Sequence, residues 1–105
     1  MCCTVDNIFC CCYIYNMKAT LLQKSRLKLD DTRFVEIVIW QVSSPLRGSA
    51  HDFKYRLVCV DNEVCVLRYD NEMGKGDHKH IGEIEVSYTF TTLDQLVEDF
   101  WADVA

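Results

Sequence analysis

One short stretch of the chain, residues 70–80, concentrates the side chains that could do chemistry. It reads Asp-Asn-Glu-Met-Gly-Lys-Gly-Asp-His-Lys-His and contains two of the chain's four glycines, with a third at position 82. Glycine adopts positive φ without strain, and successive backbone N–H groups in such a turn can form a nest that binds an anion. We therefore predict that this stretch is a phosphate-binding loop shaped by Gly74 and Gly76.

Two histidines and two lysines in this loop suit the cleavage of RNA. In an extended chain His78 and His80 point to one side, while Asp77 and the following lysine point to the other. Attack by a ribose 2′-hydroxyl needs one group to take its proton, a second to protonate the leaving oxygen, and cations near the phosphate. We predict that the two histidines are base and acid, in either order, and that Lys75 and Lys79 contact the phosphate.

Residues next to the loop and on two strands could extend this site. Tyr69 could stack on a base and Asn71 could orient a phosphate, although an aromatic residue at a strand end more often packs in the core. Basic side chains also alternate on two predicted strands, where Arg26 and Arg56 could contact RNA. The alternative is that these basic rows are solvated faces of a sheet.

A metal site is the competing interpretation of the same loop. Asp77, His78 and His80 offer mixed oxygen and nitrogen ligands at close spacing. This spacing supplies few donors, and His51 is the only other histidine in the chain. We therefore expect no metal ion or other cofactor. A further alternative is a solvated turn whose glycines only shape the backbone.

The strands that position these residues are predicted from hydrophobic patterning. Alternating or β-branched runs predict strands at residues 17–29, 33–42, 53–60 and 64–69, with a weaker fifth strand at 83–90. Asp61 and Asn62 predict a tight turn, because short polar side chains tolerate left-handed backbone. These strands follow one another as an antiparallel meander.

A helix is predicted at the C-terminus. Residues 92–95, Thr-Leu-Asp-Gln, form a capping-box pattern that marks a helix start. One apolar stripe then recurs at helical spacing, and it consists of Leu93, Leu96, Val97, Phe100 and Trp101. The predicted fold class is therefore α+β, an antiparallel meander sheet of four to five strands with one C-terminal helix packed on it.

Composition limits the chain to one folded domain of modest acidity. Its 105 residues, half of them hydrophobic, suffice for a single core. The net charge of −5 argues against a protein that coats nucleic acid by bulk electrostatics, because phosphate neutralisation needs clustered lysine and arginine. A local basic surface remains compatible with this charge.

The N-terminal residues differ from the rest, since five of the seven cysteines lie among the first twelve residues. We expect residues 1–16 to be a Cys-rich extension, disordered or the product of an upstream start site, before a single α+β domain at residues 17–105. Cys59 and Cys65 alternate with valines like small hydrophobes, which indicates free thiols in a reducing compartment. With no signal-peptide pattern and no apolar run of membrane length, we expect a cytoplasmic protein without membrane contact.

The most specific pattern in the chain is Tyr-Asp-Asn-x-x-Gly-Lys-Gly-Asp-His-x-His at residues 69–80. It is accompanied by Val-Glu-Ile-Val-Ile-Trp at 35–40, Lys-Tyr-Arg-Leu at 54–57 and Phe-Trp-Ala-Asp at 100–103. In these segments the chain from Met17 to Val104 resembles the TumE family of toxin–antitoxin proteins. The resemblance implies a toxin of a type II pair that a helix-turn-helix antitoxin holds inactive and that inhibits growth through RNA.

Chemistry and resemblance together predict a metal-independent ribonuclease that acts on RNA through the Gly/Lys/His loop. The alternative is a non-catalytic module that binds phosphate or nucleic acid, which a net-acidic chain without a complete catalytic constellation would suit. Nucleotide transfer or hydrolysis is disfavoured, because the sequence has no Walker pattern. The expected partners are RNA and the antitoxin, and a homo-oligomer is left open.

Overall fold

The computed structural model of the chain describes residues 19–43, 51–72 and 74–105. The extension predicted at residues 1–16 lies outside the described residues, as do the first two residues of the strand predicted at 17–29. Within the described ranges the chain forms a six-stranded sheet and one helix. The α+β class and the C-terminal helix are therefore confirmed.

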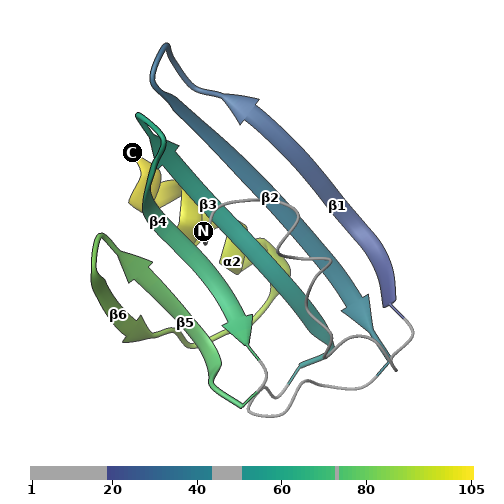
Figure 1. The fold of residues 1–105 in the computed structure, drawn as a ribbon. Coiled ribbons are helices and arrows are strands. Elements are labelled where there is room, and N and C mark those ends of the chain that lie inside the picture. The colour runs from purple at the N-terminus through teal and green to yellow at the C-terminus, as the bar shows by residue number, and fades with distance from the viewer. Residues whose placement is uncertain (1–18, 44–50, 73) are drawn as a thin grey trace.

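The sheet is an antiparallel meander in which each strand pairs with the next one along the chain (Figure 1). Its strands are β1 (Ala19–Lys28), β2 (Arg33–Val42), β3 (Phe53–Asp61), β4 (Val64–Glu72), β5 (Gly76–Ile81) and β6 (Ile84–Ser87). Along each strand, side chains alternate between the two sides of the sheet. Residues that are paired on neighbouring strands point to the same side. The sheet therefore has two chemically distinct faces.

The sheet has six strands, so the prediction of four to five strands was wrong. The additional strand is β5, which lies within the stretch predicted as a loop. Its residues pair with β4 from Glu72 opposite Gly76 to Leu67 opposite Ile81. In the described part of the connection between β4 and β5, Gly74 (φ +86°) and Gly76 (φ +76°) take the left-handed backbone that glycine permits. The polar, glycine-containing sequence therefore codes a hairpin rather than an open loop.

The turn between β3 and β4 also differs from the prediction in its position. Positive φ occurs at Asn62 (51°) and Glu63 (67°), so the turn lies one residue later than the predicted Asp61-Asn62 pair. Two successive left-handed residues match the twist of the flanking strands in a two-residue hairpin. This turn sets the register of β3 against β4, in which Asp61 lies opposite Val64.

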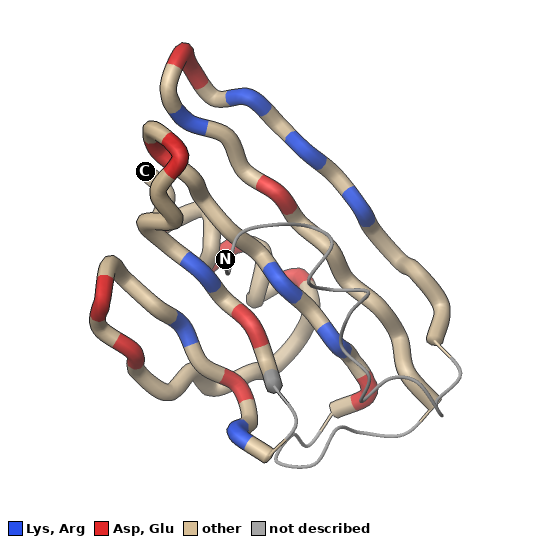
Figure 2. Tube along the Cα trace, in the orientation of Figure 1, with Lys and Arg blue, Asp and Glu red and all other residues tan. Residues whose placement is uncertain are grey.

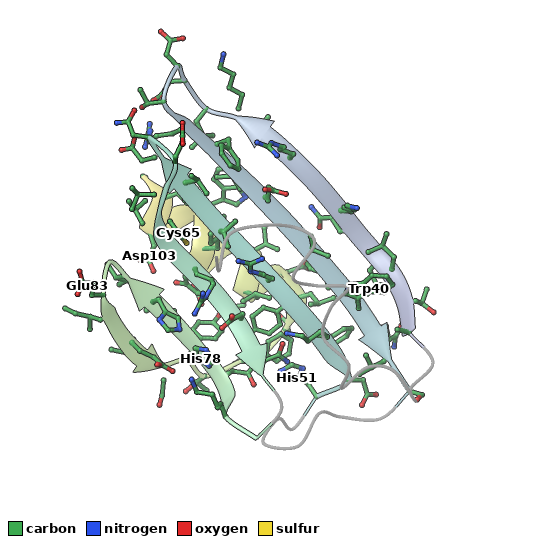
Figure 3. The ribbon with its side chains drawn as sticks, in the orientation of Figure 1. Trp40, His51, Cys65, His78, Glu83 and Asp103 are labelled. Atoms are coloured by element: carbon green, nitrogen blue, oxygen red, sulfur yellow. The ribbon has the colours of Figure 1, made fainter. Side chains whose placement is uncertain are left out.

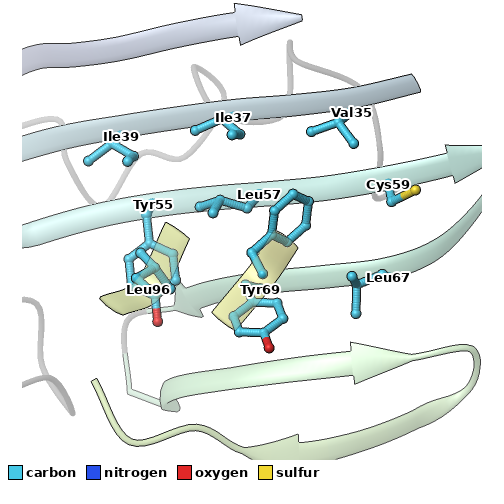
Figure 4. Packing of buried hydrophobic residues seen from close by; sticks show 10 residues of the cluster. Val35, Ile37, Ile39, Tyr55, Leu57, Cys59, Leu67, Tyr69 and Leu96 are labelled. Atoms are coloured by element: carbon cyan, nitrogen blue, oxygen red, sulfur yellow. The ribbon is translucent and has the colours of Figure 1, made fainter. Parts of the chain in front are cut away.

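Helix α2 (Leu93–Val104) packs across one face of the sheet, which we call the helix face. Thr92 caps the helix, since its side-chain oxygen accepts a hydrogen bond from the Gln95 backbone N–H at 3.1 Å. Leu96 and Phe100 are fully buried against the sheet. Figure 4 shows Leu96 at Tyr55 of β3, in the same cluster of buried side chains as Leu57. The apolar stripe predicted for the helix thus forms the helix side of the hydrophobic core.

Polar contacts fix the helix on this core. The Asp103 carboxylate of α2 accepts a hydrogen bond from the Tyr69 hydroxyl of β4 and another from Lys79 Nζ of β5 at 3.0 Å. One turn earlier, Asp99 accepts from the Tyr88 hydroxyl at 2.6 Å. Burial opposes ionisation of Asp103, but the hydrogen bonds from Tyr69 and Lys79 outweigh it and lower the pKa of that carboxyl. The ionised carboxylate therefore joins helix and sheet.

Asp103→Asn is expected to lower the free energy of unfolding at pH 7 by about 1 kcal/mol, because the site is partly exposed and the charged hydrogen bonds are screened. A carboxyl whose pKa is lowered by folding stabilises the protein above its unfolded pKa of about 4, and this contribution is lost as the pH falls through the folded pKa. Urea denaturation should therefore show a difference from wild type that shrinks towards pH 3. Glu98→Gln on the exposed side of α2 is the matched control, and a pH-independent difference would contradict the account.

Candidate functional site

The face of the sheet opposite α2 carries two rows of side chains that run across the strands, and we call it the charged face. The first row consists of Arg26, Glu36, Val58, Arg68, His80 and Glu85. The second row consists of Lys24, Val38, Arg56, Asp70, His78 and Ser87. Figure 2 shows basic and acidic positions on β1 to β4. Ionisable groups are thus concentrated where the two rows cross β4 and β5.

The closest approach in this cluster joins Asp70 of β4 to His78 of β5. Oδ1 of Asp70 lies 2.7 Å from Nε2 of His78, and the two residues are only 5% and 3% exposed. Nδ1 of His78 lies 3.1 Å from the Gly76 carbonyl oxygen, and because a carbonyl oxygen only accepts, Nδ1 carries a proton. In a neutral ring Nε2 would then present a lone pair to a carboxylate. A cation at this contact, at the least a proton on Nε2, removes that repulsion.

The second imidazole has the opposite environment. Nε2 of His80 lies 2.8 Å from a terminal nitrogen of Arg68, and because a guanidinium only donates, Nε2 is the unprotonated acceptor. Burial, and next the positive charge of Arg68, lower the pKa of His80 below its usual range. The two rings stand edge to face with their centroids 5.0 Å apart. The cluster therefore holds one imidazole beside a carboxylate and one beside a guanidinium.

Further charges surround this pair. Arg68 Nε lies 3.1 Å from Asp70 Oδ2, so the guanidinium links the carboxylate to His80. Glu85 of β6 lies 3.7 Å from Lys75 Nζ and 3.8 Å from His78 Nε2. Arg56 of β3 is opposite Asp70 in the register and is buried. The predicted basic row on β3 is therefore a buried part of the cluster and not a solvated face.

The structure brings together some of the residues selected from the sequence. His78 and His80 share the charged face, as predicted from their spacing, and Figure 3 shows His78 on β5. Arg56 lies opposite Asp70, and Lys75 adjoins His78 through Glu85. Arg26 lies on β1 in the same row as His80 but is paired with Glu36 at 3.7 Å, three strands away from β4.

Three other selected residues, Tyr69, Asn71 and Lys79, point to the helix face because side chains alternate along a strand. Tyr69 is buried in the core and Lys79 binds Asp103, as described above. Asn71 is fully buried, where its side chain accepts from the Tyr55 N–H at 3.0 Å and donates to the Phe53 carbonyl at 2.7 Å. All three contact protein atoms that hold β3, β4, β5 and α2 together.

The ligand set that the sequence suggested for a metal is divided between the two faces. Asp77 lies on the helix face, where its carboxylate oxygen is 2.6 Å from His51 Nε2 and accepts from the Tyr55 hydroxyl at 2.8 Å. Asp70 takes its place, and one ligand atom each from Asp70, His78 and His80 lies within 4.8 Å of the others. Sequence reasoning missed this carboxylate and Arg68, since both require residues 76–81 to be paired as a strand.

Arg68→Met is expected to raise the pKa of His80, because the substitution removes a positive charge that disfavours the imidazolium. Long-range ¹H–¹⁵N NMR of the histidine rings across a pH titration measures this directly. Arg26→Met, which removes an arginine from the same row at β1, is the matched control and should leave the titration of His80 in place. An unchanged or lowered pKa of His80 in Arg68→Met would show that the guanidinium does not act on this ring.

Comparison with known proteins identifies the family. In the part of the chain that the structure describes, no helix has the length and apolar character needed to cross a bilayer. Searches of the curated proteins and of the solved structures gave no match. A family model described as "Toxin TumE" matches residues 17–105, which confirms the resemblance seen in the sequence. The chain therefore belongs to the TumE toxin family, as a toxin of a toxin–antitoxin system.

Proposed function

We propose that this toxin is a ribonuclease that cleaves RNA by attack of a ribose 2′-hydroxyl, with no metal ion as cofactor. The observation that carries the proposal is the pair of imidazoles on the charged face, 5.0 Å apart and in opposite electrostatic environments. One imidazole beside a carboxylate and one beside a guanidinium suit the roles of acid and base. Arginines beside the pair supply the cations that such a reaction needs near phosphate.

His80 is assigned the role of base. Its Nε2 already holds an unprotonated lone pair, because Arg68 donates into it at 2.8 Å. An RNA phosphate offers the guanidinium a stronger, charged acceptor, so substrate binding draws Arg68 away and exposes this lone pair. Nε2 then takes the proton of the 2′-hydroxyl while the 2′-oxygen forms a bond to phosphorus.

His78 is assigned the role of acid. Its Nδ1–H is held by the Gly76 carbonyl, and a proton on Nε2 would face the Asp70 carboxylate oxygen 2.7 Å away. That proton passes to the 5′-oxygen as its bond to phosphorus breaks, giving a 2′,3′-cyclic phosphate and a 5′-hydroxyl. Because His78 is buried, the contact with Asp70 must open when RNA binds, as happens where catalytic contacts form only with substrate.

The proposed RNA-binding surface extends from this pair along the charged face. Arg68 lies against His80 and Asp70, Arg56 is opposite Asp70 in the strand register, and Lys75 lies at the β4–β5 turn whose backbone Gly74 and Gly76 shape. The more distant Arg26 continues the row on β1. Tyr69, Asn71 and Lys79 support this surface from the helix face, so their contribution to RNA binding is indirect.

Membership of a toxin family implies an antitoxin as partner. We propose a helix-turn-helix protein for this role and the cytoplasm as the site of action, since RNA is accessible there. The free thiols of Cys59 and Cys65 agree with a reducing compartment. Binding of the antitoxin over the charged face would hold the imidazoles away from RNA.

A second candidate function is binding of RNA without cleavage. It is favoured by His78, whose two ring nitrogens both face protein atoms and whose side chain is 4% exposed. In that case the charged face would capture phosphate, and the RNA would keep its length. Product analysis separates the two functions, because only cleavage generates new RNA ends.

His80→Ala and His78→Gln are each expected to slow RNA cleavage by about 10²–10⁴-fold, the usual contribution of a proton-transfer group. Gel analysis of a labelled RNA measures the rate, and cleavage should persist in excess EDTA. His51→Gln is the matched control, because His51 is the one described histidine that points to the helix face. Full activity in a doubly substituted His78→Gln, His80→Ala protein would exclude the mechanism.

A further inference from the structure

The contact between Asp70 and His78 is electrostatically incomplete. Their facing atoms are 2.7 Å apart, yet neither Oδ1 nor Nε2 has a hydrogen-bond partner of acceptable geometry among the described residues. Both residues are more than nine-tenths buried, so water does not compensate freely. Since Nδ1 is committed to the Gly76 carbonyl, Nε2 is the nitrogen of His78 that faces the carboxylate, and in a neutral ring both atoms would offer lone pairs to the same space.

His80 offers a third ligand atom near that space. The three ligand atoms of Asp70, His78 and His80 lie within 4.8 Å of one another. Two ligands of a tetrahedral zinc ion are about 3.3 Å apart, given bonds of about 2.0 Å. The Asp70–His78 pair therefore needs to open by only about half an ångström, and a separation at the 4.8 Å limit would have to close by about 1.5 Å around an ion.

The donor set selects the kind of metal. Two imidazole nitrogens and one carboxylate oxygen suit a borderline transition metal such as Zn²⁺ rather than Mg²⁺ or Ca²⁺, which prefer oxygen ligands. The ligands come from β4 and β5, which pair directly through Asp70 opposite His78. Adjacent strands hold the three side chains on one face, so the fold brings the ligands together before a metal ion binds.

Arg68 is the resident cation that a metal must displace. Its guanidinium lies 2.8 Å from His80 Nε2 and 3.1 Å from Asp70 Oδ2, so it uses one of the three ligand atoms. A nearby positive charge also repels a metal ion. Removing Arg68 should therefore strengthen metal binding, whereas removing a ligand should weaken it. This opposite response distinguishes a site at these atoms from zinc bound elsewhere on the chain.

We propose that Asp70, His78 and His80 form a site for Zn²⁺, and that zinc bound there inhibits RNA cleavage by occupying the nitrogens of both histidines. The inhibition rests on the proposed ribonuclease function, whereas zinc binding does not. A ring nitrogen that ligates a metal has no lone pair for the 2′-hydroxyl proton and no proton for the leaving oxygen. Zinc would thus regulate the same site that acts without a metal cofactor.

The test is a titration of the full chain, labelled with ¹⁵N-histidine, with ZnSO₄ under a non-chelating phosphine reductant. The chain has only three histidines, so ring resonances report this site even if cysteines bind zinc as well. We expect the Nε2 resonances of His78 and His80 to shift together while those of His51 stay in place. Zinc should also abolish RNA cleavage, and a chelator should restore it.

Two variants sharpen the titration. Asp70→Asn should weaken zinc binding at the histidine resonances by about tenfold or more, and Arg68→Met should tighten it. His51→Gln is the matched control and should bind as wild type does. If Asp70→Asn fails to fold, the wild-type titration and Arg68→Met still decide the matter.

The possible results of these titrations test the zinc site, the inhibition and the ribonuclease function separately. Resonances of His78 and His80 that do not respond to zinc, or weaker binding in Arg68→Met, would overturn the site. Zinc that binds these histidines and increases cleavage would overturn the inhibition. Zinc binding by a chain that cleaves no RNA at any zinc concentration would support the site and refute the ribonuclease function, so the two proposals fail separately.

Discussion

The contact between the Asp70 carboxylate and the His78 imidazole is the constraint on which the chemistry of the charged face depends. Gly76 fixes Nδ1 of the ring, so Nε2 meets the carboxylate at 2.7 Å and requires a cation between them. A proton there makes His78 an acid, whereas a metal ion would remove that role. Arg68 lies on the other oxygen of the same carboxylate and on His80, so both imidazoles respond to one ion pair.

Strand alternation separates this chemistry from the packing that supports it. In β5, His78 and His80 face the charged side, while Asp77 and Lys79 face α2. The helix-facing residues form hydrogen bonds to His51, Tyr55 and Asp103, which anchor β5 to the core and to the C-terminal helix. The stability of the helix contact and the geometry of the imidazole pair are therefore linked through a strand of six residues.

Much of this fold follows from the sequence, and the exceptions have physical causes. Strand β2 begins and ends at the predicted residues, because its apolar and β-branched side chains are buried on both faces. Strand β5 escaped prediction since Gly76–Ile81 carries polar side chains that resemble a loop. Those side chains are tolerated in a strand because they satisfy one another across the sheet, as His78 does with Asp70 and Lys79 with Asp103. Such pairing depends on residues distant in sequence and leaves no local periodic signal.

The candidate site, like the fold, could be predicted from the sequence only in part. The spacing of His78 and His80 sufficed to place both on one side, but Tyr69, Asn71 and Lys79 were chosen for their residue types, and in the structure strand alternation directs them to the helix face. Arg68 and Asp70 could be assigned only after β4 and β5 were paired, because their register partners on β5, His80 and His78, lie twelve and eight residues further along the chain.

The most direct measurement of the central claim is the chemistry of the RNA ends. The full chain is incubated with an RNA of defined sequence, and the products are analysed by mass spectrometry, beside the same RNA carrying a single 2′-deoxynucleotide 5′ of the cleaved bond. The account predicts a 2′,3′-cyclic phosphate and a 5′-hydroxyl from the first RNA and no cleavage at the modified position. Cleavage at the deoxynucleotide, or intact RNA in both reactions, would contradict it.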